Sequence, residues 1–183
     1  SSDVCSSDLA ALRRRRPDCR LRLAGHGFEA DGPAVRWASG RGLTAGVEFL
    51  GHLSHAAVIA EIRERADVFV HPTLEESFGS SILEAMSQRV PVVAGIRSGA
   101  VPWILDEGRA GLLVDVASAD ALGRGMERLM DDEGLRSRLA SAGFERARGE
   151  FSLAAVADRF LELLERVRHE QGVPSLERSP CGV

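Results

Sequence analysis

The chain has 183 residues, of which 44% are hydrophobic and 27% are charged, enough to bury the continuous core of one domain. Its formal net charge is −4, so the protein has no overall positive field that would attract a nucleic-acid backbone or an anionic membrane. These values exclude a general polyanion-binding protein, and nucleic acid is not expected as a partner.

The two ends of the chain differ in composition from the region between them. Residues 1–9 nearly repeat a Ser-Ser-Asp unit without helical or strand periodicity, and we interpret them as a non-native or linker segment. Helix breakers interrupt residues 171–183, which are expected to form a disordered tail. A single domain is therefore predicted over residues 10–170.

Short β-branched or leucine-rich runs alternate with longer helical patterns along this domain. The alternation predicts an α/β fold of the Rossmann-like kind, in which a parallel sheet has helices on both faces. The strands are expected over residues 20–24, 47–50, 68–71, 90–94 and 112–114. Each of these runs stops at a turn-forming or polar residue.

Helices are expected over residues 35–41, 54–65, 80–88, 120–130, 134–148 and 152–168. Apolar residues three and four positions apart, as in Leu122, Met126 and Leu129, predict that one face of each later helix is buried. Ser118 and Ser152 are the predicted N-caps, and Gly172 is a predicted C-terminal stop.

The densest set of polar residues that could bind a ligand comes directly after the strand predicted over residues 68–71. In a parallel sheet, ligands bind outside the carboxyl ends of the strands, where the loop from Glu75 to Ser81 lies. Gly79 permits a close backbone approach, and the first N–H groups of the following helix lack partners within the helix. These groups suit an anion such as a diphosphate.

Two carboxylates flank this helix start. Glu76 lies in the loop and Glu84 in the second turn of the helix, and helical side chains lean toward the N-terminus, so both carboxylates can converge on one cleft. Ionised carboxylates accept hydrogen bonds from sugar hydroxyls. Two alternatives without a ligand stay open. In the first, Glu76 only complements the helix dipole; in the second, Glu84 only faces solvent.

Other residues that could carry chemistry have simpler explanations. The basic run 13–16 fits a solvated helix face, and the widely spaced Cys5, Cys19 and Cys181 favour neither a zinc site nor a disulfide framework. The five histidines lack metal-ligand spacing, and His26 and His71 are interpreted as core or strand-end residues. The chain also lacks a membrane-spanning run and a secretion signal, so a soluble, cytoplasmic protein is expected.

The segment 76–86 resembles the E-x7-E signature of GT-B glycosyltransferases in family four (glycosyl transferases group 1). Six further landmarks of that family follow the same order in this chain, at residues 23–27, 49–53, 66–73, 90–94, 98–102 and 111–114. The resemblance spans roughly residues 10–168. It implies the C-terminal, nucleotide-sugar-binding half of a retaining hexosyltransferase.

The resemblance also implies a role for each matching residue. Glu76 would contact the donor hexose and is the expected catalytic residue, Glu84 would contact the ribose hydroxyls, and the turn at Gly51 would border the base. The diphosphate would lie on the backbone of residues 78–81. The expected donor-binding residues are Gly25, Gly27, Gly51, His52, Leu53, Ser77, Phe78, Gly79, Ser80, Ser81 and Glu84. The nucleotide-diphosphate sugar is a substrate, so neither a resident cofactor nor a metal is expected.

Two departures from the family pattern qualify these implications. Trp103 stands where the family usually has an acidic residue, and the chain does not include the strand with the family's Arg and Lys phosphate ligands or the acceptor-binding domain. A missing N-terminal acceptor domain is therefore an expected partner, through which any membrane contact would be made. This chain alone is expected to be inactive in transfer, since electrostatic stabilisation of the leaving group would be incomplete.

Two other functions remain open. The first is a non-catalytic nucleotide-sugar-binding or scaffold module that keeps only the Rossmann-like shell. The second is another GT-B enzyme, such as a sugar-nucleotide epimerase or a phosphorylase. A phosphorylase needs a lysine for pyridoxal phosphate, and this sequence contains none.

Overall fold

The structure, a computed structural model, describes residues 12–13 and 16–171. The chain divides into two compact units, Ser1–Ala147 and Arg148–Val183. The segment 1–9, the tail over residues 172–183 and the helix stop at Gly172 lie outside the described residues.

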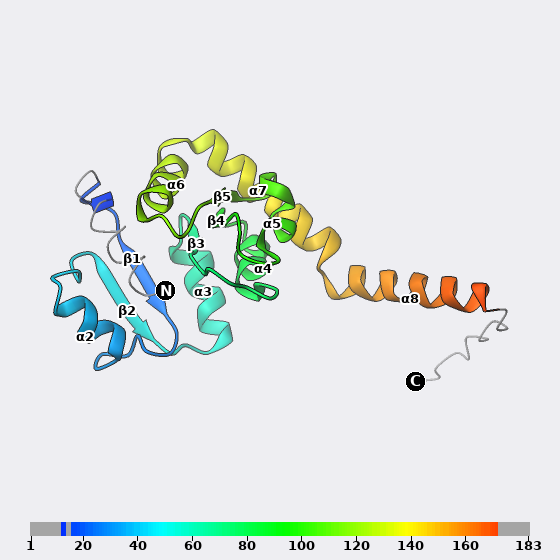
Figure 1. The fold of residues 1–183 in the computed structure, drawn as a ribbon, viewed down its shortest axis with the longest axis horizontal. Helices are drawn as coiled ribbons and strands as arrows, with labels where there is room; N and C mark the ends of the chain where they lie inside the picture. The colour runs from blue at the N-terminus through cyan, green and yellow to red at the C-terminus, as the bar shows by residue number, and fades with distance from the viewer. Residues whose placement is uncertain (1–11, 14–15, 172–183) are drawn as a thin grey trace. The chain divides into compact units, whose positions relative to one another are not determined.

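All five predicted strands are present, and every pairing is parallel (Figure 1). β1 (Leu21–Ala24) pairs with β2 (Val47–Gly51), and a second sheet has the order β3-β4-β5, formed by Phe69–His71, Val92–Gly95 and Leu112–Val114. The strands therefore form two sheets where the sequence indicated one. Hydrophobic periodicity identifies a strand but not its partner, so the sequence could not show this division.

Every predicted helix is present, with ends shifted by up to two residues. One further helix, α5, begins within the family landmark at residues 98–102, where no helix is predicted. The helices are α2 (Pro33–Ser39), α3 (His55–Arg65), α4 (Ser80–Ser87), α5 (Val101–Ile104), α6 (Ala119–Asp131), α7 (Glu133–Glu150) and α8 (Leu153–Glu170), and a 3-10 turn covers Asp106–Gly108.

Serine side chains begin three of these helices. Ser118 caps α6 and Ser152 caps α8, each by accepting the N–H three residues later at 3.2 Å, which confirms both predicted N-caps. Ser54 caps α3 in the same way at 3.3 Å. Each cap satisfies one of the N–H groups that a helix start leaves without a partner.

The second sheet is covered on both faces, as the Rossmann-like interpretation requires. Val93 of β4 packs in a buried cluster with Leu122 and Met126 of α6. Val92 and Ala94 point to the opposite face, because side chains alternate along a strand, and they are fully buried where α4 and α5 contact β4. The sheet thus lies between α6 and the α4–α5 pair (Figure 1).

Gly125 allows α6 to approach this sheet closely. A Cβ atom there would lie 2.8 Å from Val114 Cγ1 and 3.4 Å from Val93 Cγ1, whereas a Cβ at Gly123 of the same helix would meet no atom within 4 Å. We expect Gly125→Ala to lower the free energy of unfolding by about 1 kcal/mol, since overpacking outweighs the gain in helix propensity. Gly123→Ala is the matched control and should not lower it. Urea denaturation measures both, and equal stability of the two variants would contradict this packing.

The described part of the basic run does not form the solvated helix face expected from the sequence. Arg13 donates a hydrogen bond to the carbonyl of Cys19, and Arg16 pairs with Asp131. Asp131 is the last residue of α6, where the helix dipole adds to the attraction for a cation. Arg14 and Arg15 lie outside the described residues.

The second unit contains α8. Its exposed large apolar residues are Leu153, Val156, Phe160, Leu161, Leu163, Leu164 and Val167.

No described helix combines the length and low charge that crossing a membrane requires.

Candidate functional site

The carboxyl ends of β1 and β2 carry the family landmarks at residues 23–27 and 49–53. The N–H of Gly25 donates to the carbonyl of Gly51 at 2.8 Å, which ties the two turns together. The rings of His26 and His52 stack at 4.3 Å between centroids, with an interplanar angle of 14°. The structure thus brings together the predicted residues Gly25, Gly51 and His52, and Leu53 leads from this point into α3.

Glu76 is held by contacts to both carboxylate oxygens. Oε1 accepts the N–H of Phe78 at 3.2 Å, and Oε2 lies 3.1 Å from Nε2 of His71, the last residue of β3. The Phe78 hydrogen bond is the main cause that lowers the pKa of Glu76 below its ordinary value; burial opposes this, while the Gly79 N–H and His71 add to the lowering. Glu76 is therefore expected to be ionised and aligned at neutral pH.

Gly79 starts α4 in a conformation that favours glycine, with φ 76° and ψ 50°. Its carbonyl accepts the N–H of Ile82 at 2.9 Å. Within the described part of the chain, the N–H groups of Ser80 and Ser81 have no hydrogen-bond partner. These two amides, together with the helix dipole, can hold an anion.

The turn after β4 closes against the Glu76 loop. The N–H of Ala100 donates to the Glu76 carbonyl at 3.2 Å, and Oγ of Ser98 donates to the Thr73 carbonyl at 2.5 Å. Gly99 has φ 55°, and a Cβ there would fall 2.0 Å from the Glu76 carbonyl oxygen. Glycine at position 99 is therefore required for this close approach.

Glu84 faces the start of α3. Its Oε1 lies 3.1 Å from Nε2 of His55, and the Glu84 side chain is 26% exposed. His55 is the first residue of α3 and follows the turn that was predicted to border the base. The alternative of a purely solvent-facing Glu84 does not describe this arrangement.

Contacts lead from Glu76 to the face of α4 that also carries Glu84. Oγ of Ser81 lies 3.4 Å from Nδ1 of His71, whose Nε2 contacts Glu76. Ser81 and Glu84 are three residues apart on α4 and so share one face of the helix. Glu76 and Glu84 therefore lie on the same side of α4, with the Ser80 and Ser81 amides between them in the sequence. Their roles toward a ligand stay predictions, as do those of Gly27, Ser77 and Phe78.

The sequence interpretation missed the two histidines that contact these carboxylates. His71 was assigned to a strand end without a partner, although it lies only five residues before Glu76. His55 was given no role, and its contact to Glu84 spans 29 residues. A local motif carries no signal for a contact of that separation.

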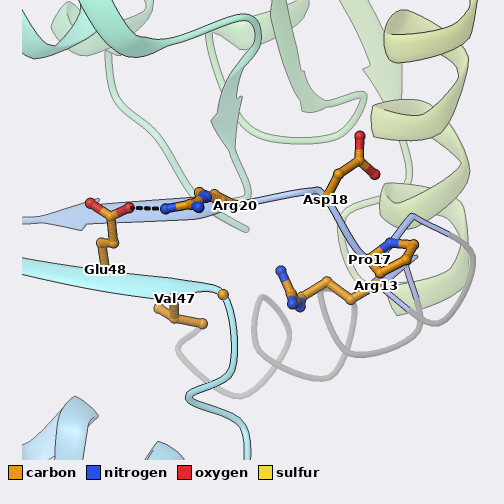
Figure 2. Close-up of a pocket in the computed structure, with 7 residues that line it drawn as sticks. Arg13, Pro17, Asp18, Arg20, Val47 and Glu48 are labelled. Atoms are coloured by element: carbon orange, nitrogen blue, oxygen red, sulfur yellow. Dashed lines mark ion pairs between the residues drawn. The ribbon is translucent and has the colours of Figure 1, made fainter.

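A cavity lies at the other end of β1 and β2, away from this edge (Figure 2). Arg20 pairs with Glu48 there at 3.6 Å, and Arg13 donates a hydrogen bond to the Cys19 carbonyl. None of the predicted site residues lines it. The lining residues are Arg13, Pro17, Asp18, Arg20, Gly46, Val47 and Glu48. Because it lies away from the predicted site residues, this cavity is not the candidate site. The described residues also contain no cluster of three or more potential metal ligands.

The lowered pKa of Glu76 makes stability depend on pH. A carboxyl group whose pKa is lower in the folded state stabilises the fold above its ordinary pKa, and this contribution is lost as the pH falls through the folded value. We therefore expect the free energy of unfolding of the wild type to fall more steeply on acidification than that of Glu76→Gln. Urea denaturation over a series of acidic pH values measures this, and parallel curves would contradict it.

A model of the family "Glycosyl transferases group 1" matches residues 6–146. The chain belongs to this family. LpsE of Rhizobium meliloti (strain 1021), a lipopolysaccharide core biosynthesis glycosyltransferase, is 35% identical over 150 residues, which are 82% of this chain and 43% of LpsE. The alpha-D-kanosaminyltransferase of Streptomyces kanamyceticus is 31% identical over 86% of this chain and 40% of its own length. The chain thus spans about two fifths of these relatives.

Solved structures agree with the fold. Sucrose-phosphate synthase from Thermosynechococcus elongatus superposes with a TM-score of 0.72 at 27% identity, covering 90% of this chain and 42% of that enzyme. Anabaena HepE, solved with UDP and glucose, has a TM-score of 0.71 at 23% identity over 86% of this chain and 43% of HepE, and so supports the fold alone. The α/β, GT-B interpretation of the sequence is confirmed.

Proposed function

We propose that this chain is the donor-binding domain of a retaining glycosyltransferase that moves a hexose from a nucleotide-diphosphate sugar to an acceptor. The observation that carries the proposal is the position of Glu76 and Glu84 on one side of α4, beside the unpaired amides of Ser80 and Ser81. LpsE and the kanosaminyltransferase, both named for sugar transfer, support it.

Each part of the donor has a matching group in this proposal. The diphosphate binds the Ser80 and Ser81 amides, Glu84 accepts from ribose hydroxyls, and Glu76 accepts from the hexose. The bond from the anomeric carbon to the phosphate oxygen breaks, a bond to the acceptor oxygen forms on the same face of the sugar, and the proton of the acceptor hydroxyl passes to the departing diphosphate. The helix start stabilises the charge of the departing diphosphate, without a resident metal or cofactor.

The acceptor is bound by a part of the parent protein outside this chain. We expect any membrane contact to be made by that same part. We expect the reaction to take place in the cytoplasm. Since transfer requires the acceptor to be held beside the anomeric carbon, the chain by itself should bind donor and transfer no sugar.

Titration calorimetry of the 183-residue chain with UDP-glucose, GDP-mannose and ADP-glucose tests the proposal. We expect saturable binding of at least one donor, competed by its free nucleoside diphosphate. The absence of saturable binding for all three would contradict the assignment.

A further inference from the structure

Each of the two site carboxylates faces its own histidine. His71 Nε2 lies 3.1 Å from Oε2 of Glu76, and His55 Nε2 lies 3.1 Å from Oε1 of Glu84. The two histidines come from different elements, the end of β3 and the start of α3. The two pairs can therefore be altered independently.

The surroundings of His71 give each of its ring nitrogens a partner. Its side chain is only 12% exposed, and both ring nitrogens have partners, Oγ of Ser81 at 3.4 Å and Glu76. When the Ser81 hydroxyl donates to Nδ1, the proton stays on Nε2 and is donated to Glu76. With the Phe78 N–H on its other oxygen, the Glu76 carboxylate is held in one orientation and keeps lone pairs for a hexose hydroxyl.

Glu84 is held at one oxygen only. His55 contacts Oε1, and among the described residues no group hydrogen-bonds Oε2. His55 itself is largely exposed, so it adds little packing to the fold. Its contact orients the carboxylate and leaves the two lone pairs of Oε2 for the two ribose hydroxyls.

We propose that His71 and His55 are positioning residues for the two halves of the donor: His71 aligns Glu76 toward the hexose, and His55 aligns Glu84 toward the ribose. The proposal rests on the proposed function of this site. A side chain that is already ordered loses less conformational freedom on binding. Removing either histidine should therefore weaken binding of its half of the donor by about three- to tenfold.

The test compares three ligands on five proteins: wild type, His71→Leu, His71→Gln, His55→Leu and His55→Gln. The ligands are the hexose donor from the titration above that binds the wild type, its free nucleoside diphosphate, and the 2′,3′-dideoxy form of that diphosphate. His71→Leu should weaken binding of the hexose donor and leave binding of the other two ligands unchanged. His55→Leu should weaken binding of the hexose donor and of the free diphosphate equally, and leave binding of the dideoxy ligand unchanged. Glutamine keeps an N–H group at Nε2, so the glutamine variants should regain much of the lost affinity.

Equal weakening of all three ligands by His71→Leu would show a merely structural role and overturn the proposal. Unchanged binding in both leucine variants would overturn it too. If His71→Leu does not fold, Ser81→Ala, which removes the hydroxyl on Nδ1, decides by the same selective loss of the hexose donor. A wild type that binds none of these ligands refutes the proposed function itself, a result distinct from an unselective loss.

Discussion

Glu84→Ala is expected to weaken binding of the free nucleoside diphosphate about 100-fold. In the proposed site, this carboxylate accepts hydrogen bonds from two ribose hydroxyls, and bonds to a charged group contribute about 1.5 to 3 kcal/mol each. A loss of about 3 kcal/mol corresponds to the stated factor. Calorimetric titration of the diphosphate measures the change.

Two comparisons separate this effect from a general loss of negative charge. Glu64→Ala removes the same charge from an exposed position near the end of α3, where Glu64 contacts Arg63, and should leave binding unchanged. Glu76→Ala should weaken binding of the hexose donor and leave binding of the free diphosphate unchanged. Diphosphate binding that tolerates the loss of Glu84 would contradict the ribose role.

Gly99→Ala should cost both stability and donor binding. The new Cβ would fall 2.0 Å from the Glu76 carbonyl oxygen at φ 55°, so the backbone that carries Glu76 must move. We expect the free energy of unfolding to fall by about 2 to 4 kcal/mol, from backbone strain and overpacking together. Denaturation and donor titration on the same preparation measure the two effects.

Gly42→Ala is the matched control for this change. Gly42 has φ 67°, but a Cβ there would meet no atom within 4 Å. The variant therefore has the backbone strain but no clash, and it should retain donor binding. If both variants lost the same stability and both bound donor normally, the close contact between Gly99 and Glu76 would not be a feature of the folded protein.

The strands and most helices could be predicted because their signals are local. The predicted strand over residues 90–94 begins two residues late, at Val92, since Pro91 has no N–H for the ladder. Helix α5 was missed because Ser98, Gly99 and Pro102 are typical of a turn. Pro102 in fact lies in the first turn of α5, where a missing N–H costs nothing.

The site was predictable only in part, because only some of its residues are close together in the sequence. Glu76, Gly79 and Glu84 stand in one short segment, so their pattern carries information about the site. The partners of the carboxylates come from elsewhere: His55 from α3, and the Ala100 N–H from the turn after β4. Such contacts depend on how the elements pack, which a linear pattern does not encode.

A crystal structure of the chain with its tightest-binding nucleotide-diphosphate hexose tests the central claim most directly. We predict one ligand along the start of α4, with its ribose on the carboxylate of Glu84, its diphosphate on the Ser80 and Ser81 amides, and its hexose on Glu76. A nucleotide sugar bound at the cavity beside Arg13 and Arg20, with both carboxylates untouched, would contradict the account.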